Sequence, residues 1–101
     1  MEATEQRIFA DLGAITVTRG VYELSKRNPV FGQFVEKSLA RFTLCDWGDL
    51  CQEDKEMNEI SINPANDAGR VLARYNSPEA EIFITTEWDR SATTILFPSE
   101  Y

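Results

Sequence analysis

The segment that begins at Asn28-Pro29 constrains the fold most strongly, because it carries a complete helix signal. Asparagine is a preferred N-cap and proline is favoured at the first helical position, so we predict a helix from Pro29 to about Thr43. Side chains recur along it at intervals of three and four, which is typical of one buried helix face. The buried face consists of Phe31, Phe34, Val35, Ser38, Leu39 and Phe42. It needs a second apolar layer to cover it.

Residues 81–87 and 92–97 can supply that layer, because both segments alternate in the manner of strands. A turn centred on Asp89-Arg90 lacks the glycine that a two-residue hairpin turn prefers, so we expect a longer loop with a bulge. The resulting register brings apolar residues together on the face that meets the helices. It pairs Thr86 with Thr93, Ile84 with Ile95, and Ile82 with Phe97.

Local signals predict the remaining elements. Residues 14–18 and 70–75 read as strands, and Thr18 caps a short helix that ends near residue 26. A third helix is expected from about residue 49 to residue 59. We therefore predict one α+β domain over residues 1–101, in which an antiparallel sheet of three to four strands packs against two to three helices. Residues 1–13 are expected to form a polar lead-in, with a helical turn near residues 7–12.

Charge narrows the classes of partner. The chain has 17 acidic and 10 basic residues, which gives a net charge of −7. A nucleic-acid binder or a protein of anionic membranes needs clustered Lys and Arg, so we expect neither direct nucleic-acid binding nor membrane binding. A basic protein partner is favoured electrostatically, although acidity also serves solubility alone. Residues 1–6 do not resemble a secretion signal, so a cytoplasmic location is expected.

The residue types argue against catalysis. Without histidine the chain has no Cys-His dyad and no Ser-His-Asp triad. Acidic neighbours disfavour the thiolate at Cys45 and Cys51, and the spacing of these cysteines does not match a zinc site. We expect reduced structural thiols, no cofactor, no metal and no catalytic residue. Glu87 and Asp89 flank Trp88, but a surface hairpin explains them as well as acid–base chemistry does.

A row of carboxylates is the most informative feature. On a helix, Asp49, Glu53, Glu56 and Glu59 would share one face, about 4.5–6 Å apart along the axis. This spacing is comparable to that of phosphates along a nucleic-acid strand, about 3.4 Å of rise plus the lateral step. A plain solvated helix face is the alternative. Asp54 would fall on the inner face and pair with Arg90 or Arg74. Other residues expected to point inward are Trp47, Leu50, Cys51, Met57 and Asn58.

Three stretches carry a resemblance: ITVTRGV from residue 15, CDWGDLC from residue 45, with Glu53, Asp54 and Asn58 after it, and ITTEWDRSATTILFPSEY from residue 84. They resemble a family of proteins of about this length from plasmids and integrative conjugative elements of gut Firmicutes. The likeness runs from about residue 8 to the end, and the family has no assigned catalytic residue. The resemblance implies a mobile-element context, in which small acidic proteins disarm host defence, anti-restriction and anti-CRISPR proteins among them.

Together these observations predict a non-enzymatic inhibitor that occupies the basic nucleic-acid-binding site of a CRISPR effector or another nucleic-acid-handling host protein. An exposed tryptophan, Trp47 or Trp88, could anchor the contact. The alternative is an accessory or self-associating protein of the mobile element, as a homodimer, which an exposed patch around Phe83 and Leu96 would favour. The predicted partner-binding residues are Asp46, Asp49, Glu53, Glu56, Glu59, Trp88 and Asp89.

Overall fold

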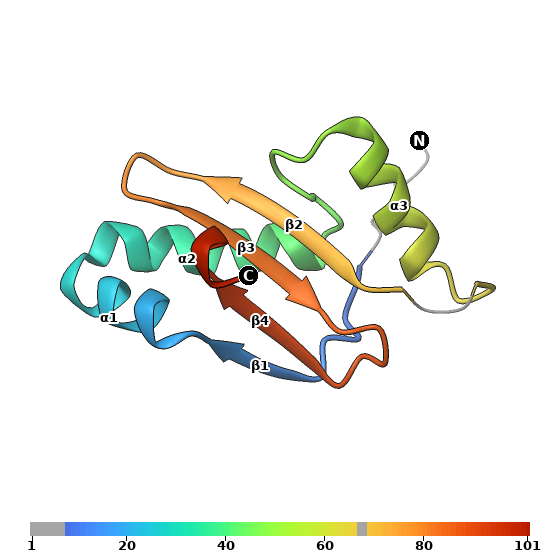
Figure 1. Cartoon of the computed structure of the whole chain (residues 1–101), viewed down its shortest axis with the longest axis horizontal. Coiled ribbons are helices and arrows are strands. Elements are labelled where there is room, and N and C mark those ends of the chain that lie inside the picture. Colours follow the sequence, from blue (N-terminus) through green and yellow to red (C-terminus); the bar gives the residue numbers. More distant parts are fainter. Residues whose placement is uncertain (1–7, 67–68) are drawn as a thin grey trace, which may run out of the picture.

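The computed structural model describes residues 8–66 and 69–101 and has an α+β fold (Figure 1). Within these residues one strand is followed by three helices and then by three more strands, and the strand order in the sheet is β1-β4-β3-β2. A short 3-10 turn, η1, follows the last strand. The elements are β1 (Ala14–Val17), α1 (Arg19–Arg27), α2 (Pro29–Thr43), α3 (Gln52–Ile62), β2 (Val71–Asn76), β3 (Glu81–Thr86), β4 (Ala92–Leu96) and η1 (Pro98–Glu100).

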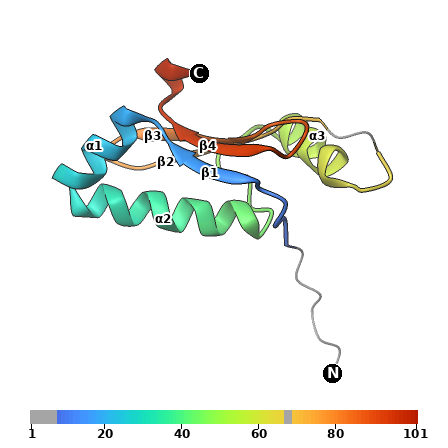
Figure 2. The ribbon, with the colours of Figure 1, turned by 90° about the horizontal axis from the view of Figure 1, so that it is seen from below.

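The elements form two layers. Figure 2 shows α2 along one face of the sheet and η1 over the opposite face. In Figure 1, β1 forms one border of the sheet, while α3 lies beyond the other border, next to β2. Any surface on α3 is therefore remote from the free edge of β1.

Both predicted helix starts are confirmed. The Thr18 hydroxyl accepts a hydrogen bond from the Val21 amide (3.4 Å) at the start of α1. The Asn28 side chain accepts one from the Phe31 amide (3.2 Å) at the start of α2. These side chains satisfy amides that have no partner within the helix, so the local sequence fixes both starts.

The predicted hairpin register is confirmed where Thr86 pairs with Thr93 and Ile84 with Ile95. The third predicted pair, Ile82 with Phe97, is not part of the ladder, because β4 ends at Leu96. The expectation of a purely antiparallel sheet is wrong, because β1 runs parallel to β4. This ladder begins with the Ala14 amide on the Ser91 carbonyl (3.0 Å) and joins segments far apart in the sequence. Alternation within a strand predicts which side chains face the core, but it does not predict the direction of a distant neighbour.

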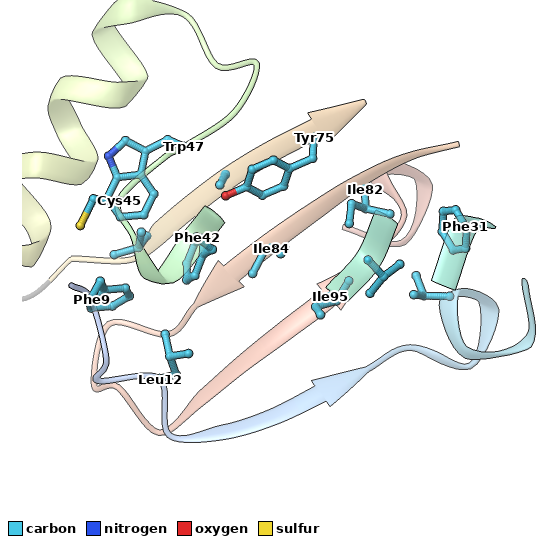
Figure 3. Packing of buried hydrophobic residues seen from close by; sticks show 14 residues of the cluster. Phe9, Leu12, Phe31, Phe42, Cys45, Trp47, Tyr75, Ile82, Ile84 and Ile95 are labelled. Atoms are coloured by element: carbon cyan, nitrogen blue, oxygen red, sulfur yellow. The ribbon is translucent and has the colours of Figure 1, made fainter. Parts of the chain in front are cut away.

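Aromatic and branched side chains fill the space between the sheet and α2 (Figure 3). Phe42, Ile82 and Ile84 are fully buried. The part of the lead-in that the structure describes contributes to this core, because Phe9 packs edge-on against Phe42 and Trp47. Leu12 is also buried. Residues 8–13 form no helical turn, and residue 7 of the predicted turn lies outside the described residues.

The third helix begins later than predicted, at Gln52 rather than near residue 49. The preceding segment runs along the edge of β2, where Gly48 bridges to Arg74. The Asp49 amide donates to the Arg74 carbonyl (2.7 Å) and the Arg74 amide donates to the Trp47 carbonyl (3.3 Å). Gly48 has a φ of +75° and no room for a Cβ atom beside the Arg74 carbonyl. Tertiary pairing with β2 therefore overrides the helical tendency of residues 49–51.

Candidate protein-binding surface

Asp46 is neutralised by an arginine of the same chain. The Arg41 guanidinium donates from Nε to Oδ2 (2.7 Å) and from Nη2 to Oδ1 (3.1 Å) of this carboxylate. The pKa of Asp46 is lowered, chiefly by the Arg41 hydrogen bond, and the amide of Gly48 also donates to it. The Tyr75 hydroxyl holds the Asp46 carbonyl (2.6 Å). Asp46 therefore stabilises the conformation of residues 46–49, the segment that pairs with the edge of β2.

Two acids of the predicted stripe also have structural partners. Asp49 lies outside α3, and its Oδ2 accepts a hydrogen bond from the Asn76 amide (3.1 Å). Glu59 lies in α3 but accepts the indole N–H of the buried Trp47 (2.7 Å). The prediction of four aligned, outward carboxylates is therefore wrong, because Asp49 lies outside the helix and Glu59 turns toward the Trp47 indole. Glu56 stays exposed and accepts a hydrogen bond from Gln52 Nε2 one turn earlier on α3 (3.4 Å).

A different acidic face remains on α3. Glu53, Asp54 and Glu56 are exposed, and none of them forms an ion pair with any residue in the described ranges 8–66 and 69–101. Met57 and Ile60 lie among them with exposed fractions of 59% and 52%. Glu53, Glu56, Met57 and Ile60 follow the i, i+3, i+4, i+7 spacing that places side chains on one helix side. Together with Asp54, which is next to Glu53 in the sequence, these residues form what we call the α3 outer face: Glu53, Asp54, Glu56, Met57 and Ile60.

The composition of this face differs from the prediction at Met57 and Asp54, which were both expected to point inward. The inward position is taken by Asn58, which is 5% exposed. Its Nδ2 donates to the Leu72 carbonyl (2.8 Å) and its Oδ1 accepts from the Leu72 amide (3.2 Å). A carboxamide can satisfy both backbone groups of one residue, whereas a carboxylate can only accept. Asn58 therefore ties α3 to β2.

Neither arginine proposed for Asp54 is available to it. Arg74 forms an ion pair with Glu81 on the neighbouring strand. Arg90 donates to the carbonyls of Ser61 (2.6 Å) and Gly69 (2.7 Å). These bonds attach the β3–β4 turn to the last turn of α3.

The tip of the β3–β4 hairpin exposes Trp88, whose exposed fraction is 64%. Glu87 pairs with Arg70 (3.2 Å), so its charge is partly compensated. Asp89 accepts a hydrogen bond from the Ser91 amide (3.0 Å), and its pKa is lowered by the Ser91 side chain and amide. Residues 87–91 join the two strands, so the predicted loop longer than two residues is confirmed, and Arg90 takes a φ of +61° within it. The tip thus holds an exposed aromatic ring beside one ionised carboxylate.

The patch that would have favoured self-association is absent at Phe83 and Leu96. Leu96 is buried, and the ring of Phe83 packs edge-on against Tyr101 with centroids 5.6 Å apart. The two cysteines also differ in exposure, with Cys45 buried and Cys51 exposed just before α3.

Sequence reasoning missed Met57 and Ile60 as surface residues. Their spacing relative to Glu53 and Glu56 is visible in the sequence, but apolar residues at helical intervals normally indicate a buried stripe. The buried side of α3 is instead narrow: Asn58 is its buried residue, and Ile62, one turn later, is partly buried against the core. The signal that could have revealed it is that three of the four positions one turn from Asn58 are polar, whereas the fourth is Ile62.

Comparisons of the chain with protein-family models, with curated proteins and with solved structures found no match. In the ranges 8–66 and 69–101, no helix has the length and apolar character needed to cross a membrane.

Proposed function

We propose that this protein is a non-enzymatic inhibitor that binds the basic nucleic-acid-binding site of another protein through the α3 outer face. A CRISPR effector or a similar nucleic-acid-handling host protein is the proposed partner class. The observation that carries the proposal is a group of three exposed carboxylates around two exposed apolar side chains on one helix, with no ion pair to any of the three within residues 8–66 and 69–101.

Such a face has two sources of binding energy. Met57 and Ile60 are 59% and 52% exposed, so burying the exposed part of either one against a partner contributes about 0.8–1.5 kcal/mol before ordering costs. The carboxylates around them speed association with a basic surface and disfavour acidic ones. The mixture matches a helix that docks into a groove with an apolar floor and a cationic rim.

Fewer acids support mimicry of a nucleic-acid backbone than we predicted from the sequence. Of the four aligned acids, Glu53 and Glu56 remain exposed, about 4.5 Å apart along the helix axis, and neither forms an ion pair within the part of the chain that the structure describes. The proposed mechanism is therefore occupation of the basic site by a mixed acidic and apolar face. The resemblance to mobile-element proteins supports the choice of a defence nucleoprotein as the partner.

The test uses a purified CRISPR effector, with and without its guide RNA, and a fluorescent DNA duplex that it binds. We expect the protein to displace the duplex from the effector, with binding that weakens about tenfold as NaCl rises from roughly 50 to 300 mM. The double variant Glu53→Lys/Glu56→Lys should lose at least about tenfold in affinity.

The matched control reverses two exposed acids elsewhere, Glu36 and Glu79, with the same change in net charge. It should lose less than about threefold in affinity. Equal losses in both double variants would contradict a role for the α3 outer face. Failure to displace DNA or guide from any effector tested would refute the partner class.

A further inference from the structure

The two edges of the sheet differ in whether another segment of the chain pairs with them. The edge at β2 is closed by residues 47–49, through the bridge between Gly48 and Arg74 and the bond from the Asn76 amide to Asp49. At the opposite edge β1 is the outermost strand, and all four residues of β1 are exposed. Exposed edges are usually blunted by charge, proline or a covering segment. In β1, which reads AITV, none of these devices is present.

The backbone of β1 has free hydrogen-bonding groups on that edge. The amides of Ala14 and Thr18 donate to the Ser91 and Ile95 carbonyls of the β4 side (3.0 Å each). Alternate residues of a parallel strand direct both backbone groups to the same neighbour. The N–H and C=O groups of Ile15 and Val17 therefore point away from the sheet.

A groove lies beside this edge on the helix side. It has a volume of about 330 Å³ and runs along α1 and α2. Ile15 and Val17 pair with Thr93 and Ile95 of the core-facing register, so their side chains share the groove's side of the sheet. They are 50% and 41% exposed. A strand added to β1 would place every second side chain over the groove. The groove is lined by Val17, Tyr22, Ser25, Gly32, Val35 and the charged Lys26 and Glu36.

We propose that a second copy of this chain pairs with β1 in antiparallel orientation, with Ile15 opposite Val17 of the second copy and Thr16 at the twofold axis. In this register Ile15 and Val17 of both copies exchange four main-chain hydrogen bonds. Each copy's Ile15 then lies over the other copy's groove, and the contact is self-complementary, as a twofold interface requires.

Charge at β1 is compatible with the same occupant. The strand itself is uncharged, so two copies meet there without like charges. Antiparallel pairing carries the exposed Asp11 of one copy toward the exposed Arg19 of the other, whose charge is partly compensated by Glu23 of its own copy (3.0 Å). A continuous eight-stranded sheet results, with both α3 outer faces at its far borders. Self-association therefore leaves the proposed inhibitory surface free and is independent of the proposed function.

Salt separates the two contacts. Each copy carries a net charge of −7, so added salt screens the repulsion between copies and strengthens their pairing. Binding of a basic partner at α3 should weaken under the same change. Sedimentation equilibrium at ~10 µM to 1 mM protein, in ~50 and ~500 mM NaCl, tests this difference. A reductant is present, because the exposed Cys51 could form a disulfide-linked dimer.

We expect the weight-average mass to rise with concentration from 11.5 kDa toward twice that value, and to rise further at high salt. Ile15→Lys should weaken pairing at least about tenfold. Val17→Pro, which removes an outward donor and leaves the β4 ladder intact, should do the same. The control Val30→Lys makes the same charge change at an exposed valine of α2 and should not weaken pairing. Circular dichroism checks that every variant is folded.

Amide hydrogen exchange locates the contact. Ile15 and Val17 should gain protection as concentration rises, whereas Thr16, already facing β4, should not change. A monomer at ~1 mM in both salts, an equal loss in Val30→Lys, or a dimer insensitive to Ile15→Lys would each overturn the proposal. Loss of DNA displacement by Glu53→Lys/Glu56→Lys does not depend on this result, so the two proposals can fail separately.

Discussion

Replacing Asn58 should release α3 from the sheet, because this side chain holds both backbone groups of Leu72. Asn58→Ala removes two hydrogen bonds worth roughly 1 kcal/mol each and leaves the half-buried Leu72 groups less well satisfied. We therefore expect the free energy of unfolding to fall by about 2–3 kcal/mol. Urea denaturation followed by circular dichroism measures it at pH 7.

Asn58→Asp tests whether the donor on the Asn58 side chain is required. The carboxylate keeps the acceptor but faces the Leu72 carbonyl without a donor, so burial and repulsion raise its folded-state pKa above the unfolded value of about 3.9. A raised folded pKa means that the variant is most stable, relative to the natural protein, at low pH and loses stability as pH rises through the folded pKa. The deficit should exceed that of Asn58→Ala at pH 7 and shrink near pH 4.

The control for both variants is Glu53→Ala on the exposed side of the same helix, which should change stability by less than about 0.5 kcal/mol. An Asn58→Ala protein that is as stable as the natural one would refute the tie between α3 and β2. So would equal deficits for Asn58→Asp at both pH values.

Three further predictions concern other parts of the chain. Gly48→Ala should lower the free energy of unfolding by about 1–3 kcal/mol in thermal or urea melts, because a Cβ at positive φ meets the Arg74 carbonyl. Asp46→Asn should flatten the acid limb of a stability–pH profile: the pKa of Asp46 is lowered by Arg41, so its contribution is present above the unfolded value and lost as pH falls through the folded pKa. Trp88→Ala should leave stability within about 0.5 kcal/mol and remove the red-shifted component of the fluorescence spectrum, whereas unchanged emission would mean that Trp88 is not exposed.

Much of the fold could be predicted because its signals are local. The caps at Thr18 and Asn28 sit next to the helices that they start, and the β3–β4 register follows from alternation across one short loop. The direction of β1 could not be predicted, because it pairs with residues 78 positions later. The start of α3 was predicted wrongly for the same reason, because pairing of Gly48 with Arg74 on a later strand competes with helix formation.

The candidate site was predicted only in part. Sequence spacing correctly suggested that Glu53 and Glu56 share one side of a helix, but spacing alone says nothing about acids that already have partners. Glu59 is held by an indole N–H from outside the helix, and Asp49 by an amide of β2. Such pairings depend on the tertiary arrangement, which a local pattern does not contain.

The most direct test of the central claim is displacement of a labelled DNA duplex from a purified CRISPR effector by the natural protein and by Glu53→Lys/Glu56→Lys, at low and moderate salt. The account predicts displacement at low salt by the natural protein and loss of it on charge reversal at α3, with the Glu36→Lys/Glu79→Lys protein still active. Displacement by the α3-reversed protein equal to that by the natural one would contradict it.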